Sequence, residues 1–222
     1  MRRITFLPTE IFLSLVAILI YGILNFHLFW KVVLGLVISI VLFAFRRSII
    51  PYQDTWKNNG EIFLAPVYGV VESIRRDTDV WEEYPFSHEV RISIGPFSEK
   101  GIYLPTSGEI SHLKAYTGLK VNRYAPAENF YRPALELAHT DIELTSKMQS
   151  KSLLRFIDCE YGQRPNLWLK SGDRGRGAAC FGHYLFGGTL VIYLPQHSDI
   201  LVYEKEYIIP GETVIAAIKD MK

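Results

Sequence analysis

Two long apolar runs stand at the start of the chain, and the pattern of apolar and polar residues changes after them. The first run covers residues 11–24 and the second covers residues 28–45, with a short break at residues 25–27. Together the runs are too long for one straight span of roughly 20 residues across a bilayer. The pattern therefore predicts two helices joined by a tight turn, and we expect a transmembrane hairpin over residues 1–50.

Basic residues flank this predicted hairpin on both sides. Arg2 and Arg3 precede the first run, and Arg46 and Arg47 follow the second. The positive-inside rule then places both ends in the cytoplasm, at a bacterial inner membrane. A signal peptide is disfavoured because no small-residue cleavage site separates the runs. Two alternatives stay open: a hairpin that enters the membrane without crossing it, and a buried hairpin of a soluble protein.

From residue 51 onward the apolar runs become short and rich in Val, Ile, Tyr and Phe. Gly and Pro interrupt them every eight to twelve residues or so, which is typical of antiparallel β-structure. We expect residues 51–222 to form a mainly β domain, a compact antiparallel sandwich or barrel. The segment Ala125–Gln149 has few strand features and is predicted to be a long loop with one helical turn.

Charge and cysteine content exclude some classes of function. The formal net charge is +1, so there is no global electrostatic case for nucleic-acid binding. Cys159 and Cys180 are the only cysteines, and neither belongs to a metal-binding spacing, so no metal is expected. We expect two reduced, buried side chains, with a single disulfide as the alternative.

Five stretches occur in an order that resembles the phosphatidylserine decarboxylase family, in its short form with an N-terminal membrane hairpin. The resemblance covers nearly the whole chain. The stretches are FAFRRSIIP, LAPVYGVVESI, VRISIGPFSEKGIYLPTSGEI, SGDRGRGAACFGHYLFGGTLVIYLP and VYEKEYIIPGETVIAAI. The fourth and fifth also look like the hairpins of lipoyl-like domains.

The resemblance implies a membrane phospholipid as substrate and a pyruvoyl cofactor made from the chain itself. In this family an aspartate, a histidine and a serine carry out the self-cleavage. By the family's motifs their positions hold Tyr68, Lys100 and Thr189 in this chain, and Gly187 and Gly188 form the cleavage turn. All three residues of the triad are therefore changed.

These changes have chemical consequences. A hydroxyl nucleophile needs a base, and the base needs an orienting group. Tyr68 is neutral near pH 7, and Lys100 is protonated unless burial lowers its pKa. Thr189 keeps a nucleophilic oxygen, and elimination from threonine would give a 2-oxobutanoyl group in place of pyruvoyl. His183, six residues before Thr189, would share its strand face and is a candidate substitute base.

Two exposed arginines are candidates for binding a lipid head group. Arg174 and Arg176 lie in the predicted hairpin SGDRGRG, where the alternative is a solvated turn.

The sequence thus predicts a phosphatidylserine decarboxylase-related membrane protein that has lost self-cleavage, carries no cofactor and binds an aminophospholipid or a partner without turnover. An active decarboxylase with a Thr189-derived ketoacyl group is the first alternative. A non-catalytic lipoyl-like module for membrane assembly is the second. A second copy of the chain, or an active paralogue, is a further candidate partner.

Overall fold

The computed structural model describes residues 3–5, 9–25, 27–44, 47–50, 56–57, 60–76, 86–96, 98–120, 137–159, 164–184 and 187–219. The chain divides into two compact units, Met1–Ile49 and Ile50–Lys222.

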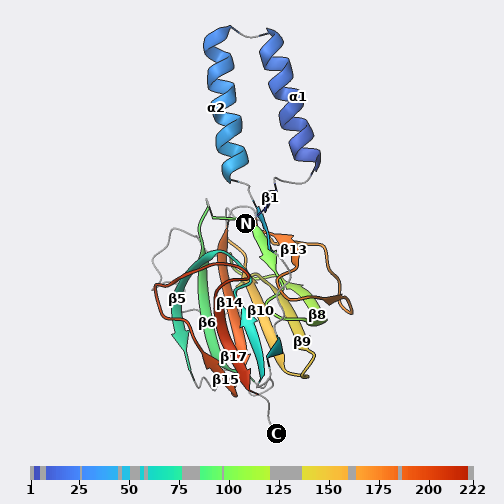
Figure 1. Cartoon of the computed structure of the whole chain (residues 1–222), viewed down its shortest axis with the longest axis vertical. Helices are drawn as coiled ribbons and strands as arrows, with labels where there is room; N and C mark the ends of the chain where they lie inside the picture. Colours follow the sequence, from blue (N-terminus) through green and yellow to red (C-terminus); the bar gives the residue numbers. More distant parts are fainter. Residues whose placement is uncertain are drawn as a thin grey trace. The chain divides into compact units, whose positions relative to one another are not determined.

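The first unit contains two helices and a small sheet (Figure 1). Helix α1 spans Thr9–Asn25 and helix α2 spans Leu28–Ala44. Strands β1 (Arg3–Thr5) and β2 (Arg47–Ile49) pair in an antiparallel manner where the chain enters and leaves the helices. The predicted pair of helices is confirmed, with ends within two residues of the apolar runs, because a long apolar sequence without Pro favours a helix.

The prediction that these helices cross a membrane is not supported. Each helix has 17 residues. Within the described residues, no helix combines the length and the apolar character that a membrane crossing requires.

The second unit is built from antiparallel strands, as predicted. Its strands are β3 (Trp56–Lys57), β4 (Gly60–Leu64), β5 (Gly69–Arg75), β6 (Phe86–Ile94), β7 (Gly101–Tyr103), β8 (Gly108–Tyr116), β9 (His139–Ser146), β10 (Lys151–Ile157), β11 (Asn166–Leu167), β12 (Arg174–Gly175), β13 (Cys180–His183), β14 (Gly188–Pro195), β15 (Ser198–Ile200), β16 (Tyr207–Ile208) and β17 (Val214–Lys219).

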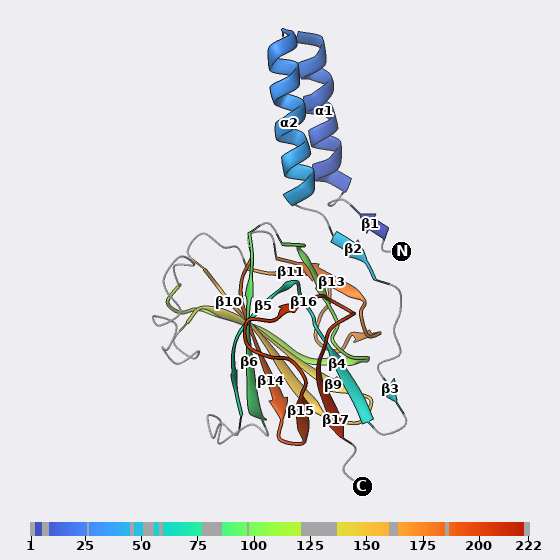
Figure 2. The same cartoon turned by 60° about the vertical axis from the view of Figure 1, so that its left-hand side comes forward.

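Most of these strands form one sheet of eight, with the order β12-β8-β9-β10-β14-β6-β5-β16 (Figure 2). A second sheet has the order β15-β17-β4-β3, and a third has the order β11-β13-β7. Side chains from all three sheets share one apolar core, for example Leu190 and Ile192 of β14, Phe63 of β4 and Phe181 of β13. The sheets are therefore layered, as the sandwich prediction requires.

Strand β14 lies in the middle of the large sheet, between β6 and β10, and all its residues are buried. The apolar run LVIYL explains this position, because a strand covered on both faces reads as continuous apolar sequence. The order of the large sheet is open: its end strands β12 and β16 are not paired with each other in the described part of the chain, so the closed form of the predicted fold does not occur there.

The loop predicted at Ala125–Gln149 is wrong for its second half. Strand β9 occupies His139–Ser146 and pairs with both β8 and β10, and a turn follows at residues 147–149. Residues 121–136 lie outside the described part. In β9, the charged and histidine residues His139, Asp141 and Glu143 alternate with less polar ones, so these three side chains face one side of the sheet. Neither cysteine forms a disulfide; Cys159 is buried and Cys180 is half-buried.

Candidate functional site

The cleavage position predicted from the sequence lies where strand β14 begins. Thr189 is 5% exposed and stands opposite Ile157 of β10 and Ser93 of β6. Residues directly opposite in an antiparallel pair present their side chains on the same face of the sheet. Thr189 therefore belongs to a row of side chains that crosses the large sheet, and the row continues to His139 and Tyr116 on β9 and β8.

The three triad-equivalent positions come together at one end of three adjacent strands. Gly188, before Thr189, is opposite Ile94, the last residue of β6. Tyr68 directly precedes β5, whose Val70 pairs with Ser93 of β6. Lys100 follows the turn that leaves the same end of β6. Tyr68, Lys100 and Thr189 are far apart in the sequence but lie at the same end of the sheet, because β5, β6 and β14 are neighbours.

Lys100 is buried, with an exposed fraction of 3%. Its Nζ atom donates hydrogen bonds to the carbonyl oxygens of Pro96 and of Gly95, the latter at 3.3 Å. Its own carbonyl accepts a bond from the backbone N–H of Tyr184 at 2.9 Å. The side chain thus acts as a donor that holds the turn after β6, whereas a general base has to offer a lone pair.

The turn before Thr189 needs glycine for two reasons. Gly187 and Gly188 have φ angles of 70° and 154°, which side-chain-bearing residues rarely adopt. A Cβ atom on Gly188 would stand 2.3 Å from the hydroxyl oxygen of Tyr184. That hydroxyl donates to the carbonyl of Ile157 at 2.8 Å, so it is held in place beside the turn.

His183 does not share a strand face with Thr189, and this prediction is wrong. His183 ends β13, which belongs to the three-stranded sheet and pairs with β7. The backbone N–H of Gly187 donates to the carbonyl of Tyr184, the residue after β13, at 3.3 Å. The ring of His183 lies 5.9 Å from that of Trp168, between centroids.

A charged cluster that the sequence analysis missed lies on the same face as Thr189. Arg155 makes two hydrogen bonds to Asp141, at 2.7 and 2.6 Å. His139 Nε2 lies 3.7 Å from an oxygen of the same carboxylate, and its ring stacks on Tyr116 with centroids 4.7 Å apart. All three members, Arg155, Asp141 and His139, are buried. The signal was available: His, Asp and Glu at every second position of HTDIE place charges on one face of a strand.

Burial and charge shift two ionisation equilibria in this cluster. The pKa of Arg155 is raised: burial acts to lower it, and the hydrogen bond and charge of Asp141 outweigh that effect. The pKa of Tyr193, on β14, is raised to about 12, first by burial and then by the charge of Glu89. The guanidinium of Arg155 lies 5.6 Å from the centre of the Tyr193 ring. Arg155 thus stays charged and Tyr193 stays neutral under ordinary conditions.

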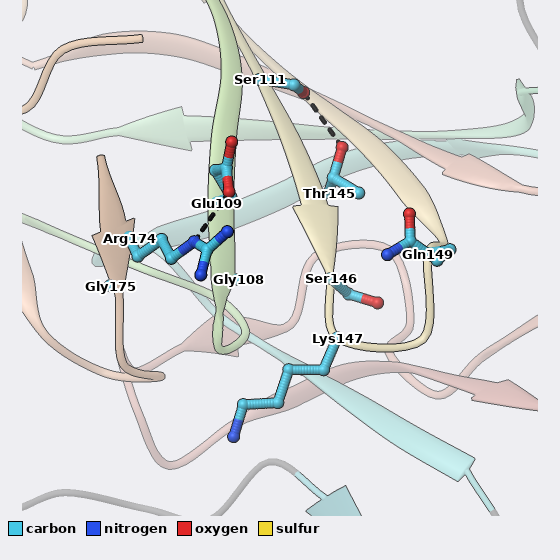
Figure 3. A pocket seen from close by; sticks show the side chains of 9 residues that line it. All are labelled: Gly108, Glu109, Ser111, Thr145, Ser146, Lys147, Gln149, Arg174 and Gly175. Carbon is cyan, nitrogen blue, oxygen red and sulfur yellow. Dashed lines mark hydrogen bonds and ion pairs between the residues drawn. The ribbon is translucent and has the colours of Figure 1, made fainter. Parts of the chain in front are cut away.

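The two predicted head-group arginines lie elsewhere. Arg174 is on the edge strand β12, and its Nε donates to Glu109 at 2.8 Å. Arg176 follows this strand and is exposed. Figure 3 shows Arg174 at a pocket of about 460 Å³ that also includes the turn after β9.

This pocket is remote from Thr189. Its residues Glu109 and Thr145 are paired with each other, and Thr145 is paired with Lys151 of β10. Lys151 is six positions along β10 from Ile157, the partner of Thr189. Six strand residues span roughly 20 Å. The structure therefore does not bring Arg174 together with the predicted cleavage turn.

Across the described residues, no group of three or more His, Cys, Asp or Glu side chains could hold a metal ion.

Comparison with known proteins gives a consistent result. No family model matches the chain. It is 29% identical over 164 residues to the phosphatidylserine decarboxylase proenzyme of Amoebophilus asiaticus, covering 71% of this chain and 68% of that protein. The protein of the same name from Prosthecochloris aestuarii is 25% identical over 170 residues, 73% of this chain and 72% of its own length. The one from Chlorobium limicola is 25% identical over 216 residues, 94% of this chain and 96% of its own length. These matches, which together extend over most of the chain, support its assignment to the phosphatidylserine decarboxylase family.

Proposed function

We propose that this protein is a decarboxylase relative that stays a single chain and binds an aminophospholipid without decarboxylating it. One observation carries the proposal: Lys100, at the position of the maturation base, is buried and directs its amine to the carbonyl oxygens of Gly95 and Pro96. Removing the proton of the Thr189 hydroxyl needs an acceptor. An ammonium group that donates to these carbonyls has no lone pair with which to accept that proton.

The chemistry of the cofactor argues in the same direction. A pyruvoyl group arises from serine, and the turn holds Gly188 and Thr189. Thr189 does not fit a pyruvoyl group, because elimination from threonine would leave a 2-oxobutanoyl group instead.

An active, divergent decarboxylase is the second candidate. It is favoured by the gathering of Tyr68, Lys100 and Thr189 at one end of β5, β6 and β14. In that case the chain would be cut between Gly188 and Thr189, and Thr189 would carry the reactive carbonyl.

The helical unit is proposed to attach the protein to a membrane without crossing it. Twelve of its large apolar side chains are at least about a third exposed, among them Leu24, Leu28, Leu36 and Ile40. Exposed apolar surface of this extent marks an interaction site, and a lipid surface is the partner that a predominantly apolar helix pair fits best.

Mass spectrometry under denaturing conditions separates the two candidates. We expect one uncut chain of 222 residues, and binding to vesicles that contain phosphatidylserine without release of CO2. The Thr189→Ala variant should then behave like the wild type in both measurements. Two fragments, 1–188 and 189–222, together with CO2 release that is lost in Thr189→Ala, would overturn the proposal in favour of the active enzyme.

A further inference from the structure

The pocket at the edge of the large sheet is lined without any large apolar side chain (Figure 3). Its lining comes from β12 and β8 on one side and from β9 and the following turn on the other. The residues are Gly108, Glu109, Ser111, Thr145, Ser146, Lys147, Gln149, Arg174 and Gly175. A cavity of about 460 Å³ with this lining suits a small, strongly polar ligand.

The cationic side of the pocket is available to an anion. Arg174 and Lys147 carry two positive charges against the one negative charge of Glu109, a balance of +1. The side chains of Arg174 and Glu109 are 83% and 41% exposed, and such exposed pairs are weak. An oxyanion would gain a charge-assisted, forked contact with the guanidinium. Lys147 Nζ makes no ion pair with any described residue, so its charge is not already neutralised there.

The hydroxyl groups near the pocket do not favour an anion, because each hydroxyl hydrogen is already donated to another group of the protein. Ser150 Oγ donates to Glu61 Oε2 at 3.4 Å, and Glu61 is a carboxylate with 2% exposure. A hydroxyl has one hydrogen. Ser146, at 2.8 Å from Ser150 Oγ, is therefore the donor in that pair, and its oxygen accepts the backbone N–H of Met148 at 3.1 Å, so it has no hydrogen to offer the pocket.

The second pair of hydroxyls follows the same rule. Thr145 Oγ1 donates to Ser111 Oγ at 3.1 Å, and Ser111 Oγ donates to the carbonyl of Glu143 at 3.2 Å. The oxygens of Thr145 and Ser111, whose hydrogens are already donated, form a wall of hydrogen-bond acceptors in the pocket that Arg174 and Lys147 also line. Such a wall binds a donor, such as an ammonium group, and disfavours a second anion.

We propose that this pocket binds a small zwitterion, in which a phosphate group lies on Arg174 and Lys147 and an amine lies on the acceptor wall. A free phosphoamine and the head group of an aminophospholipid share this chemistry. The site is separate from the row of Thr189, so the proposal holds whether or not the chain is cleaved.

Calorimetric titration of the full-length chain with O-phosphoethanolamine tests the proposal. Inorganic phosphate and ethanolamine, each carrying only one of the two groups, serve as comparison ligands. We expect O-phosphoethanolamine to bind at least about tenfold more tightly than either. Arg174→Gln and Lys147→Gln should each weaken the binding by about tenfold. Arg176→Gln is the matched control, since this neighbouring exposed arginine does not line the pocket, and it should leave the affinity unchanged.

Vesicles then distinguish the two sources of the ligand. If phosphatidylethanolamine vesicles compete with O-phosphoethanolamine, and phosphatidylcholine vesicles do not, the ligand is a lipid head group. If O-phosphoethanolamine binds and neither vesicle competes, it is a free phosphoamine. Absence of binding, equal affinity for inorganic phosphate, or equal losses in Arg174→Gln and Arg176→Gln would overturn the proposal. None of these outcomes depends on cleavage or decarboxylation, so they leave the test of the proposed function unaffected.

Discussion

At the scale of single residues, the changes in the predicted triad alter roles as well as identities. At the position predicted for the maturation base, Lys100 donates hydrogen bonds to the carbonyl oxygens of Gly95 and Pro96, which directly follow β6. Arg155 and Asp141 form a buried ion pair on the same face of the sheet as Thr189, and a buried pair is costly to break because one charge is left without its partner. Lys100, Arg155 and Asp141 are thus held by hydrogen bonds and an ion pair to other groups of the same chain.

The first prediction concerns Lys100. The variant Lys100→Met keeps the length and bulk of the side chain and removes the hydrogen bonds to Gly95 and Pro96. We expect the free energy of unfolding to fall by about 2 kcal/mol, because buried carbonyls lose a charged donor. Urea denaturation measures this fall. Lys170→Met, at an exposed position, is the control and should change stability by less than about 0.5 kcal/mol. Equal midpoints for both variants would show that Lys100 has no structural role.

The second prediction concerns Tyr193 and pH. Its pKa is raised from 10.0 to about 12 in the folded chain, chiefly by burial. A raised pKa means that the folded state holds the proton more tightly, so this contribution to stability is complete below pH 10 and is lost as pH rises to about 12. The loss is on the order of 3 kcal/mol. Tyr193→Phe should therefore lose less stability than the wild type between pH 9 and pH 12 or so, in denaturation curves recorded across that range. Parallel losses in the two proteins would contradict the raised pKa.

At the scale of elements, the glycine turn before β14 is the tightest constraint around the predicted site. Gly188 combines a φ angle of 154° with the nearby hydroxyl of Tyr184. Only a residue without a side chain fits both conditions. The turn also sends Tyr184 and His183 into a different sheet from Thr189, which is why spacing along the sequence could not place His183.

The third prediction follows from this turn. Gly188→Ala should lower the free energy of unfolding by about 2–3 kcal/mol, from the unfavourable φ angle and from contact with the Tyr184 hydroxyl. Combining it with Tyr184→Phe removes the hydroxyl, which is the nearest contact, and leaves the ring carbons at 2.8 and 2.9 Å from the added Cβ. In a double-mutant cycle by urea denaturation, the combined loss should be smaller than the sum of the single losses. Strict additivity would mean that the hydroxyl does not limit the side chain at position 188.

Local sequence patterns predicted the helices and strands correctly where a stretch of the chain was almost entirely apolar. Both helices and the buried strand β14 follow from continuous apolar runs. Strand β9 was missed because its charges are buried by pairing with other strands, such as Asp141 with Arg155, and a charged segment looks like a surface loop until its partner is known. The sequence analysis named Arg174 but not the pocket that it lines. The other residues of this pocket, on the turn after β9, lie near Arg174 because of the strand order, which cannot be read from the sequence.

At the scale of the whole molecule, the chain has one unit with exposed apolar helices and one with a closed apolar core. Large exposed side chains are costly in water, at roughly 25 cal/mol for each Å² of apolar surface. The helical unit therefore carries the strongest drive towards a nonaqueous partner.

The fourth prediction tests this drive. In the full chain, the double substitution Leu36→Lys and Ile40→Lys places two charges one turn apart on the exposed part of α2. We expect binding to neutral phosphatidylcholine vesicles to weaken by at least about tenfold, because charged groups do not enter the apolar layer. Leu201→Lys, at a half-exposed position in the β unit, is the control and should leave the binding unchanged. Flotation through a density gradient measures the bound fraction. Similar binding of the double variant and the wild type would exclude the helical unit as the attachment site.

The central place of β14 has a consequence for how a cut chain would behave. Any piece that begins at Thr189 contributes an inner strand and an edge strand, β16, to the large sheet, and also β15 and β17 to a different sheet. Such a piece is woven through the β unit by backbone hydrogen bonds on both sides of β14. A nicked protein would therefore keep the hydrodynamic size, the cooperative melting and the native-gel mobility of an intact one. Only solvents that dissolve the sheets would release the two parts, so native methods cannot distinguish a proenzyme from its processed form in this fold.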